Sequence, residues 1–174
     1  RGYDSAGLAT LSNNEISEKK CSGRVEELEK ILFKTPSDGT LGIGHVRWAT
    51  HGIPNVINAH PHSTEIVSVV HNGIIENSDL LKKDLENKGV KFKSQTDTEV
   101  ITLLITEALK DKTPIDSVFS TLKKLKGSFA LGIIFKDHKN IIVGARRGSP
   151  LAVGYANGEN YLGSDSYALK SMTN

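Results

Sequence analysis

The sequence predicts an α+β domain made of antiparallel sheets with helices packed outside them. Strand-like segments at both ends of the chain surround a central block of helical segments, whereas a parallel β/α fold alternates strands with helices. The 174 residues suffice for one domain, which buries roughly 70% of its unfolded surface and needs no disulfide or metal to fold. Hydrophobic residues make up 37% of the chain and charged residues 24%, which indicates a globular protein rather than a disordered one.

The first third of the chain predicts a hairpin, a helix and a strand. Segments 6–11 and 15–21 flank Asn13-Asn14, a dipeptide that favours a tight turn. Residues 24–34 carry apolar side chains at helical spacing, and residues 41–46 form a strand that contains two glycines. Glycines inside a strand indicate that another backbone or a ligand approaches closely.

The rest of the chain predicts a long loop, a buried strand, three helices and a final group of strands. Residues 49–64 have no periodicity, and loops of this length in a domain are more often functional than idle. The apolar run at 66–71 indicates a strand covered on both faces. The helices are expected at 77–88, at 96–108 behind a capping-box pattern, and at 113–125. The final strands are expected at 129–135, 141–145, 151–155 and 160–163, followed by a helix start at Ser166.

Charge and apolar runs argue against several classes of protein. The 22 basic and 20 acidic residues give a net charge of +2 and form no basic stripe, so we expect no nucleic-acid partner. The longest apolar runs are too short to span a bilayer, so we expect no membrane partner. The single cysteine, Cys21, excludes an internal disulfide and fits a reducing compartment. A cytoplasmic location is therefore the default expectation.

Arg47 and Asp97 are candidate ligand-binding residues, and each has a structural explanation as well. Arg47 and Trp48 end a strand and enter the long loop, where the arginine could be solvated and the tryptophan could fill the core. The planar guanidinium of Arg47 also suits a bidentate contact with a carboxylate. Asp97 lies in the first turn of an expected helix, where its charge interacts favourably with the helix dipole. The same carboxylate could instead hold the ammonium group of a ligand.

Asn72-Gly73 has two interpretations. It is the dipeptide that most strongly favours a two-residue hairpin turn, and apolar residues flank it on both sides. An asparagine amide beside a glycine N–H also supplies two adjacent donors, which is what an oxyanion hole requires. The glycine would then let an acyl group approach the backbone.

Histidine and cysteine provide little support for a metal or a thiol site. Five of the six histidines lie between positions 45 and 71, namely His45, His51, His60, His62 and His71. No HExxH pattern is present and Cys21 lies well upstream, so we expect neither a metal nor another cofactor. Cys21 has basic neighbours but no evident base or oxyanion donor nearby, which favours a structural or surface thiol.

Seven segments, in order along essentially the whole chain, resemble one enzyme family. They are RGYDSAG (1–7), GHVRWATHG (44–52), NAHPH (58–62), HNGIIEN (71–77), TDTEVI (96–101), GSFAL (127–131) and RGSPL (147–151). Together they look like the glutaminase domain of the glutamine–fructose-6-phosphate aminotransferases, a branch of the class II glutamine amidotransferases. The related amidophosphoribosyltransferases read differently around the first two segments.

The resemblance implies both a fold and a reaction. The fold would be that of an N-terminal-nucleophile hydrolase, a four-layer αββα sandwich of two stacked antiparallel sheets. In the reaction, an N-terminal cysteine attacks the side-chain amide of glutamine with its own α-amino group as base, and ammonia and glutamate leave. The ammonia would convert fructose 6-phosphate to glucosamine 6-phosphate in a C-terminal isomerase portion, within a full-length homo-oligomer of amino sugar biosynthesis.

The resemblance also implies roles for particular residues. Asn72 and Gly73 would form the oxyanion hole, Arg47 would bind the α-carboxylate of glutamine, and Asp97 would hold its α-ammonium group. The remaining residues implied to surround the substrate are Arg1 beside the nucleophile, Trp48, Thr50 and His51 in the loop that closes on glutamine, and the motif histidine His60.

The chain departs from the family pattern at its start. The family nucleophile precedes the RGYDSAG segment, whereas Cys21 follows it, so Cys21 does not match the nucleophile. We expect residues 1–174 to be a glutaminase domain truncated at both ends and inactive alone, without the sugar-isomerase domains. The alternatives are a noncatalytic glutamine-binding or regulatory module, the glutaminase domain of another class II amidotransferase, and a metal-dependent hydrolase that uses the histidines.

Overall fold

The computed structural model describes residues 4–48, 53 and 55–173. Its elements in chain order are β1 (Ser5–Ser12), β2 (Glu15–Ser22), α1 (Val25–Lys34), β3 (Leu41–Arg47), β4 (His62–Ser63), β5 (Val67–Ile75), α2 (Ser78–Glu86), α3 (Asp97–Ala108), α4 (Pro114–Leu122), β6 (Gly127–Phe135), β7 (Ile142–Arg147), β8 (Ala152–Ala156), β9 (Glu159–Gly163) and α5 (Ser166–Leu169). Every element expected from the sequence is present. The short strand β4, inside the expected loop, is an addition.

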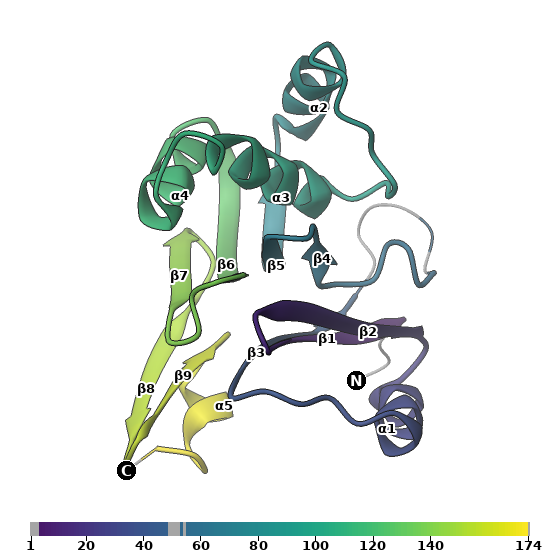
Figure 1. The fold of residues 1–174 in the computed structure, drawn as a ribbon, viewed down its shortest axis with the longest axis vertical. Coiled ribbons are helices and arrows are strands. Elements are labelled where there is room, and N and C mark those ends of the chain that lie inside the picture. The colour runs from purple at the N-terminus through teal and green to yellow at the C-terminus, as the bar shows by residue number, and fades with distance from the viewer. Residues whose placement is uncertain (1–3, 49–52, 54, 174) are drawn as a thin grey trace.

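Two antiparallel sheets lie face to face between layers of helices (Figure 1). One sheet has the strand order β2-β1-β3 and the other has the order β4-β5-β6-β7, while β8 and β9 form a small sheet of their own. Ala9, Ile43 and Ile134 are buried together where the two larger sheets meet. Helix α1 covers the outer face of the first sheet, and α2, α3 and α4 lie on the far side of the second (Figure 1). This arrangement confirms the expected α+β sandwich with αββα layers.

The first hairpin forms where the sequence predicts it. Strands β1 and β2 pair in register from Ser5↔Ser22 to Ser12↔Glu15. Between them Asn13 and Asn14 have φ angles of 50° and 65°. Two-residue hairpin turns of this kind need positive φ at both central residues, and asparagine tolerates that conformation better than most residues.

The centre of the molecule is the pair of strands β5 and β6. They are paired along nine positions, from Val67↔Phe135 to Ile75↔Gly127. The side chains of Val69, Ile101 and Ile133 are fully buried here, because α3 covers the outer face of β5 and β6. A strand covered on both faces has few polar positions, which explains the apolar run that starts β5.

Helix α3 begins as predicted, although its capping box is only half formed. The side chain of Thr96 accepts a hydrogen bond from the backbone N–H of Glu99 at 3.4 Å. The buried Glu99 carboxylate does not return to Thr96 but accepts from the backbone N–H groups of Lys93 (2.9 Å) and Ser94 (2.6 Å). It therefore fastens the preceding segment to the helix, which holds the start of α3 in place.

Cys21 lies in the core between the first sheet and α1. Its side chain packs with Ala6 and Leu28, and its Sγ atom lies 3.7 Å from the carbonyl oxygen of Ala6. This position is that of a structural thiol. Separately, none of the helices in the described ranges is both long and apolar enough to cross a membrane.

Candidate functional site

A small cavity of about 170 Å³ lies where the end of β3, the middle of β5 and the first turn of α3 meet. Its lining includes each predicted site residue that the structure describes: Arg47, Trp48, His60, Asn72, Gly73 and Asp97. The other three predicted residues, Arg1, Thr50 and His51, lie outside the described residues. Pockets for drug-sized ligands measure roughly 300–1,000 Å³. This cavity therefore suits a smaller molecule.

Arg47 ends β3 as a buried cation. It is paired with Ser5 in the sheet, and only 5% of its surface is exposed, so the interpretation of a solvated arginine is wrong. Its Nη1 atom lies 3.9 Å from Oδ1 of Asp4. Trp48, the next residue, is 67% exposed, so the interpretation that it fills the core is also wrong. Both residues nevertheless line the cavity.

Asp97 joins the start of α3 to β5. Its Oδ2 atom accepts a hydrogen bond from the backbone N–H of Ile75 at 2.8 Å. Its Oδ1 atom lies 3.8 Å from Nδ1 of His71. Asp97 is thus the first residue of α3, a position where a carboxylate stabilises the helix, and it also lines the cavity. Its two sequence-based interpretations are compatible.

Asn72 and Gly73 lie inside strand β5, so the prediction of a hairpin turn is wrong. They are paired with Ala130 and Phe129 of β6, and the strand continues beyond them to Ile75. Gly73 has a φ of 129°, a conformation that residues with a side chain rarely adopt. A Cβ atom at this position would lie 2.1 Å from the carbonyl oxygen of Ser128. The glycine is therefore required by the strand pairing itself.

A chain of ring contacts and hydrogen bonds surrounds the Asn72 side chain. Nε2 of His45 lies 2.8 Å from Oδ1 of Asn72, and the His45 ring stacks on His60 with centroids 4.5 Å apart. Nε2 of His60 and Nδ1 of His71 lie 2.7 Å and 3.0 Å from the hydroxyl of Thr98. A hydroxyl has one hydrogen and two lone pairs. It can therefore donate to one of these rings and accept from the other, which joins both histidines to α3.

Burial keeps the histidines around the cavity neutral at pH 7. Desolvation is the largest cause of the lowered pKa of each ring, because burial disfavours the charged imidazolium. It lowers the pKa of His71 to about 4, while the charge of Asp97 acts in the opposite direction. It lowers the pKa of His62, behind the cavity, to about 3. The pKa of His60 is lowered well below its usual range and that of His45 is lowered as well.

Three ring nitrogens at the cavity have no hydrogen-bond partner among the described residues. They are Nδ1 of His45, Nδ1 of His60 and Nε2 of His71. Buried polar atoms in proteins nearly always have a partner, so such a group of atoms is typical of a site for a polar ligand. In the part of the chain that the structure describes, no three His, Cys, Asp or Glu side chains are grouped so that they could hold a metal ion.

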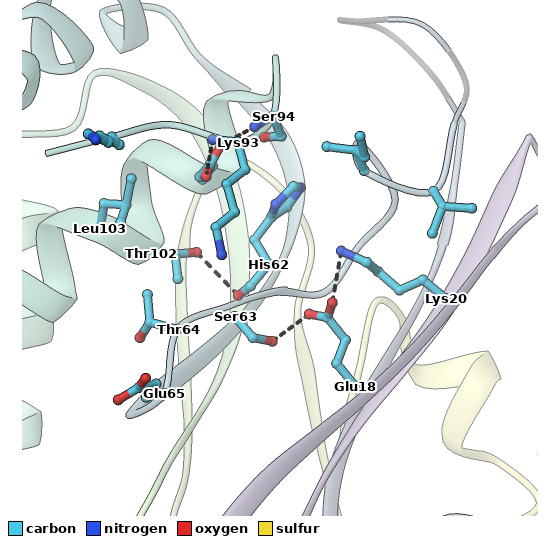
Figure 2. Close-up of a pocket in the computed structure, with 14 residues that line it drawn as sticks. Glu18, Lys20, His62, Ser63, Thr64, Glu65, Lys93, Ser94, Thr102 and Leu103 are labelled. Atoms are coloured by element: carbon cyan, nitrogen blue, oxygen red, sulfur yellow. Dashed lines mark hydrogen bonds and ion pairs between the residues drawn. The ribbon is translucent and has the colours of Figure 1, made fainter. Parts of the chain in front are cut away.

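A larger hollow of about 690 Å³ lies beside β4, between β2 and α3, and Figure 2 shows its lining. Several of its polar groups bind one another. Glu18 accepts from Ser63 at 2.6 Å and forms an ion pair with Lys20 at 2.9 Å. The hydroxyl of Thr102 donates to the carbonyl oxygen of Thr98 at 3.0 Å and lies 3.4 Å from the carbonyl oxygen of His62. None of the six described residues that the sequence predicts for the site lies in the lining of this hollow. The small cavity is therefore the better candidate site.

Five further lining residues were not predicted for the substrate site, namely His45, Val46, His71, Thr96 and Thr98. The sequence had offered His45 and His71 only as metal ligands. A signal for His45 was available. It precedes Arg47 by two positions in a strand, so the two side chains share one face of the sheet. Thr98 and His71 come together only through the packing of α3 on β5, which no local pattern records.

Comparison with known proteins gives consistent results for sequence and fold. The family model described as a glutamine amidotransferase domain matches residues 53–171. The glutamine–fructose-6-phosphate aminotransferase [isomerizing] of Mesorhizobium japonicum is 51% identical over 175 residues, which cover 100% of this chain and 29% of that protein. The protein of the same name from Zymomonas mobilis is 49% identical and is matched over 99% of this chain and 29% of its own length.

Two solved structures share the fold. The glutamine phosphoribosylpyrophosphate amidotransferase from B. subtilis, complexed with ADP and GMP, superposes with a TM-score of 0.83 at 27% identity. A structure described as the allosteric regulatory enzyme of purine biosynthesis superposes with a TM-score of 0.84, also at 27% identity. Each alignment covers 97% of this chain and 37% of the other chain.

Proposed function

Because the chain belongs to the glutamine amidotransferase domain family, we propose that the small cavity binds glutamine and that the domain hydrolyses its side-chain amide. The observation that carries this proposal is the pair of opposite charges in the cavity lining, Arg47 and Asp97. A free amino acid has an α-carboxylate and an α-ammonium group. A guanidinium and a carboxylate in one small cavity can pair with these two groups. A peptide bond or an uncharged amide has no charges that could pair with them.

Arg47 binds the α-carboxylate in this proposal. Its planar guanidinium can donate two parallel hydrogen bonds to a carboxylate. Its burial at the end of β3 excludes most of the water that would otherwise weaken such a contact. Position within the sheet also limits the rotamers of the side chain, so less conformational entropy is lost when the substrate binds.

Asp97 binds the α-ammonium group. One carboxylate oxygen is engaged by the Ile75 backbone at 2.8 Å, which orients the group. The other oxygen is available for the substrate. Because burial keeps His45, His60 and His71 neutral at pH 7, they do not repel the ammonium group next to this carboxylate.

Asn72 and Gly73 stabilise the transition state. Attack on the carboxamide carbon places a negative charge on the former carbonyl oxygen, and donors aimed at that oxygen lower the barrier. The side-chain amide of Asn72 and the backbone N–H of Gly73 are adjacent donors in the cavity lining.

The nucleophile that the family resemblance implies is an N-terminal cysteine, which precedes the RGYDSAG segment in the family. Its thiolate would form a C–S bond to the carboxamide carbon, and its protonated α-amino group would give a proton to the leaving nitrogen, so that the C–N bond breaks and ammonia departs. Water would then hydrolyse the thioester to glutamate and the free thiol.

We extend the proposal to the protein that contains this domain. The chain spans about 29% of the length of the aminotransferases it matches. We infer that residues 1–174 form one glutaminase domain, and that the ammonia is transferred to fructose 6-phosphate in a sugar-isomerase portion. Glucosamine 6-phosphate is then the product. A cytoplasmic homo-oligomer without a nucleic-acid partner completes the proposal.

The test uses the natural protein at its full length. It is incubated with glutamine, and glutamate is measured with and without fructose 6-phosphate. We expect glutamate release together with glucosamine 6-phosphate. Glutamine binding by calorimetry without any glutamate release would instead identify a noncatalytic module. Glutamate release without an amino sugar product would identify another class II amidotransferase.

A further inference from the structure

The contact between His45 and Asn72 determines which end of the Asn72 amide faces the ligand. Nε2 of His45 lies 2.8 Å from Oδ1 of Asn72. An amide oxygen carries no hydrogen and can only accept, so the ring nitrogen must be the donor. This holds for the neutral ring with its hydrogen on Nε2 and also for the charged ring. The two hydrogens on Nδ2 of Asn72 remain for other partners.

Without this contact the two ends of the amide are nearly equivalent. The oxygen and the NH₂ group of asparagine are similar in size, and rotation by half a turn exchanges them. Such a rotation would turn the negative end of the amide toward an oxygen that gains negative charge. A donor that stabilises the transition state would then become an acceptor that opposes it.

The His45 ring is itself held by several elements. It stacks on His60 at 4.5 Å with an angle of 27° between the rings. His60 is in turn bound to the hydroxyl of Thr98 at 2.7 Å, in the first turn of α3. His45 lies on β3 and Asn72 on β5, so the hydrogen bond joins the two stacked sheets. A donor fixed in this way holds the amide more firmly than a water molecule could.

We propose that His45 is a positioning residue for glutamine hydrolysis, which orients the Asn72 amide so that its NH₂ group faces the reacting oxygen. This inference rests on the proposed function of Asn72 as an oxyanion donor. In this role His45 acts through Asn72. It therefore contributes to turnover more than to the binding of glutamine.

The first test compares two substitutions in the full-length protein. His45→Phe keeps an aromatic ring for the stack on His60 but removes the donor, and His45→Gln keeps an NH₂ donor at similar reach. Loss of a complete oxyanion donor costs about 10²–10³-fold in kcat, so a misoriented one should cost roughly 10–100-fold, with KM changed less than about threefold. We expect the glutamine variant to retain kcat within about fivefold of the wild type.

A double substitution separates positioning from a general structural effect. If His45 acts through Asn72, then adding His45→Phe to Asn72→Ala should change kcat by no more than about twofold, because the interaction is already lost. A further tenfold loss in the double variant would overturn the inference. Equal loss of kcat in the Phe and Gln variants would overturn it as well. Thermal unfolding of each variant confirms that the compared proteins are folded.

A structural readout makes the inference independent of the assumed reaction. The side-chain NH₂ signals of Asn72 are followed by NMR, or its hydrogen bonds by crystallography, in the wild type and in His45→Phe. We expect the amide to rotate or to average between two orientations in the variant. An unchanged orientation would overturn the positioning role. If the amide rotates but Asn72→Ala leaves turnover intact, the positioning role stands and the proposed oxyanion role fails.

Discussion

The two hollows of the molecule differ in how their polar atoms are partnered. The hollow beside β4 is about four times larger, at about 690 Å³ against about 170 Å³. Its carboxylates Glu18 and Glu99 already have partners within the protein. The smaller cavity has a buried arginine and a carboxylate in its lining, and three histidine ring nitrogens there have no partner among the described residues. Unsatisfied buried groups are costly in a folded protein unless a ligand or water pairs with them. The partnering of polar atoms, and not size, therefore distinguishes a candidate site.

One short segment separates the two hollows. His60 lines the small cavity, and His62, two residues later, lines the large hollow. Nε2 of His60 contacts Thr98 at 2.7 Å, and Nε2 of His62 contacts Thr96 at 2.9 Å. Both histidines are thus fastened to the start of α3, so the same helix end supports both sides. If glutamine binds in the small cavity, substitutions in its lining should affect hydrolysis, whereas substitutions in the lining of the large hollow should not.

The largest expected effect is that of Asn72→Ala on turnover. Removing one oxyanion donor should lower kcat for glutamine hydrolysis about 10²–10³-fold, with little change in KM, because the donor acts in the transition state. Steady-state kinetics on the full-length protein measure this. The matched control is Lys93→Ala in the lining of the large hollow, which should leave both constants within about twofold. Equal effects of the two substitutions would end the distinction between the hollows.

The next effect concerns the stability of the cavity wall. Gly73→Ala should lower the free energy of unfolding by about 3 kcal/mol, from a positive φ and from overpacking against β6. Gly158→Ala is the control, because it has a φ of 79° and no atom within 4 Å of an added Cβ. It should cost only about 1 kcal/mol. Urea denaturation compares them. Similar losses at both sites would show that the contact with Ser128 is not tight.

Acid should destabilise the fold through the buried histidines His71, at the small cavity, and His62, at the large hollow. Their pKa values, about 3 for His62 and about 4 for His71, lie below the value of roughly 6.5 for an unfolded chain. Above pH 6.5 both histidines are neutral in the folded and the unfolded chain, so the free energy of unfolding is not reduced. It falls as the pH drops from 6.5 toward the pKa values of the folded protein, because only the unfolded chain then takes up protons. Between pH 7 and pH 5 the loss should be on the order of 2 kcal/mol per histidine.

The substitution His62→Gln measures how much His62 contributes to this pH dependence of stability. Chemical denaturation at pH 7 and pH 5 should show a smaller pH dependence in the variant, by the contribution of one histidine. An unchanged pH dependence would mean that His62 is protonated in the folded protein. Glutamine KM at pH 7 should be unaffected, because His62 lies on the side of the large hollow.

The smallest expected effect is that of Arg47→Lys on substrate binding. Lysine retains the charge but loses the two parallel donors, so KM for glutamine should rise about tenfold while kcat changes less. Calorimetric titration with glutamate provides a second measurement, since glutamate has the same α-carboxylate. A fall in kcat without a change in KM would contradict the assignment of Arg47 to ground-state binding.

Much of the fold could be predicted because its signals are local. The Asn13-Asn14 turn and the Thr96 cap each depend on a few neighbouring residues. Asn72-Gly73 shows where local reasoning fails. The dipeptide favours a turn, but the pairing of both residues with β6 outweighs that preference. No pattern along the chain reveals the identity of the partner strand.

The candidate site was predictable only in part. Resemblance placed Arg47, Asn72, Gly73 and Asp97 in one site, and all four residues line the cavity. It did not indicate that His45 supplies the hydrogen bond to Asn72, because that contact joins two sheets through residues 27 positions apart. Long-range contacts of this kind depend on packing geometry, which composition and periodicity do not encode.

Strand β5, which carries Asn72 and Gly73, also determines how the domain should lose function on heating. Both residues are exposed positions of a strand that is paired with β6, and neither is carried on a loop. Amide hydrogens in central paired strands exchange with solvent mainly through global opening, whereas those at exposed segments exchange through small fluctuations. The oxyanion donors should therefore persist until the whole domain unfolds. Heat inactivation and global unfolding should then follow the same curve.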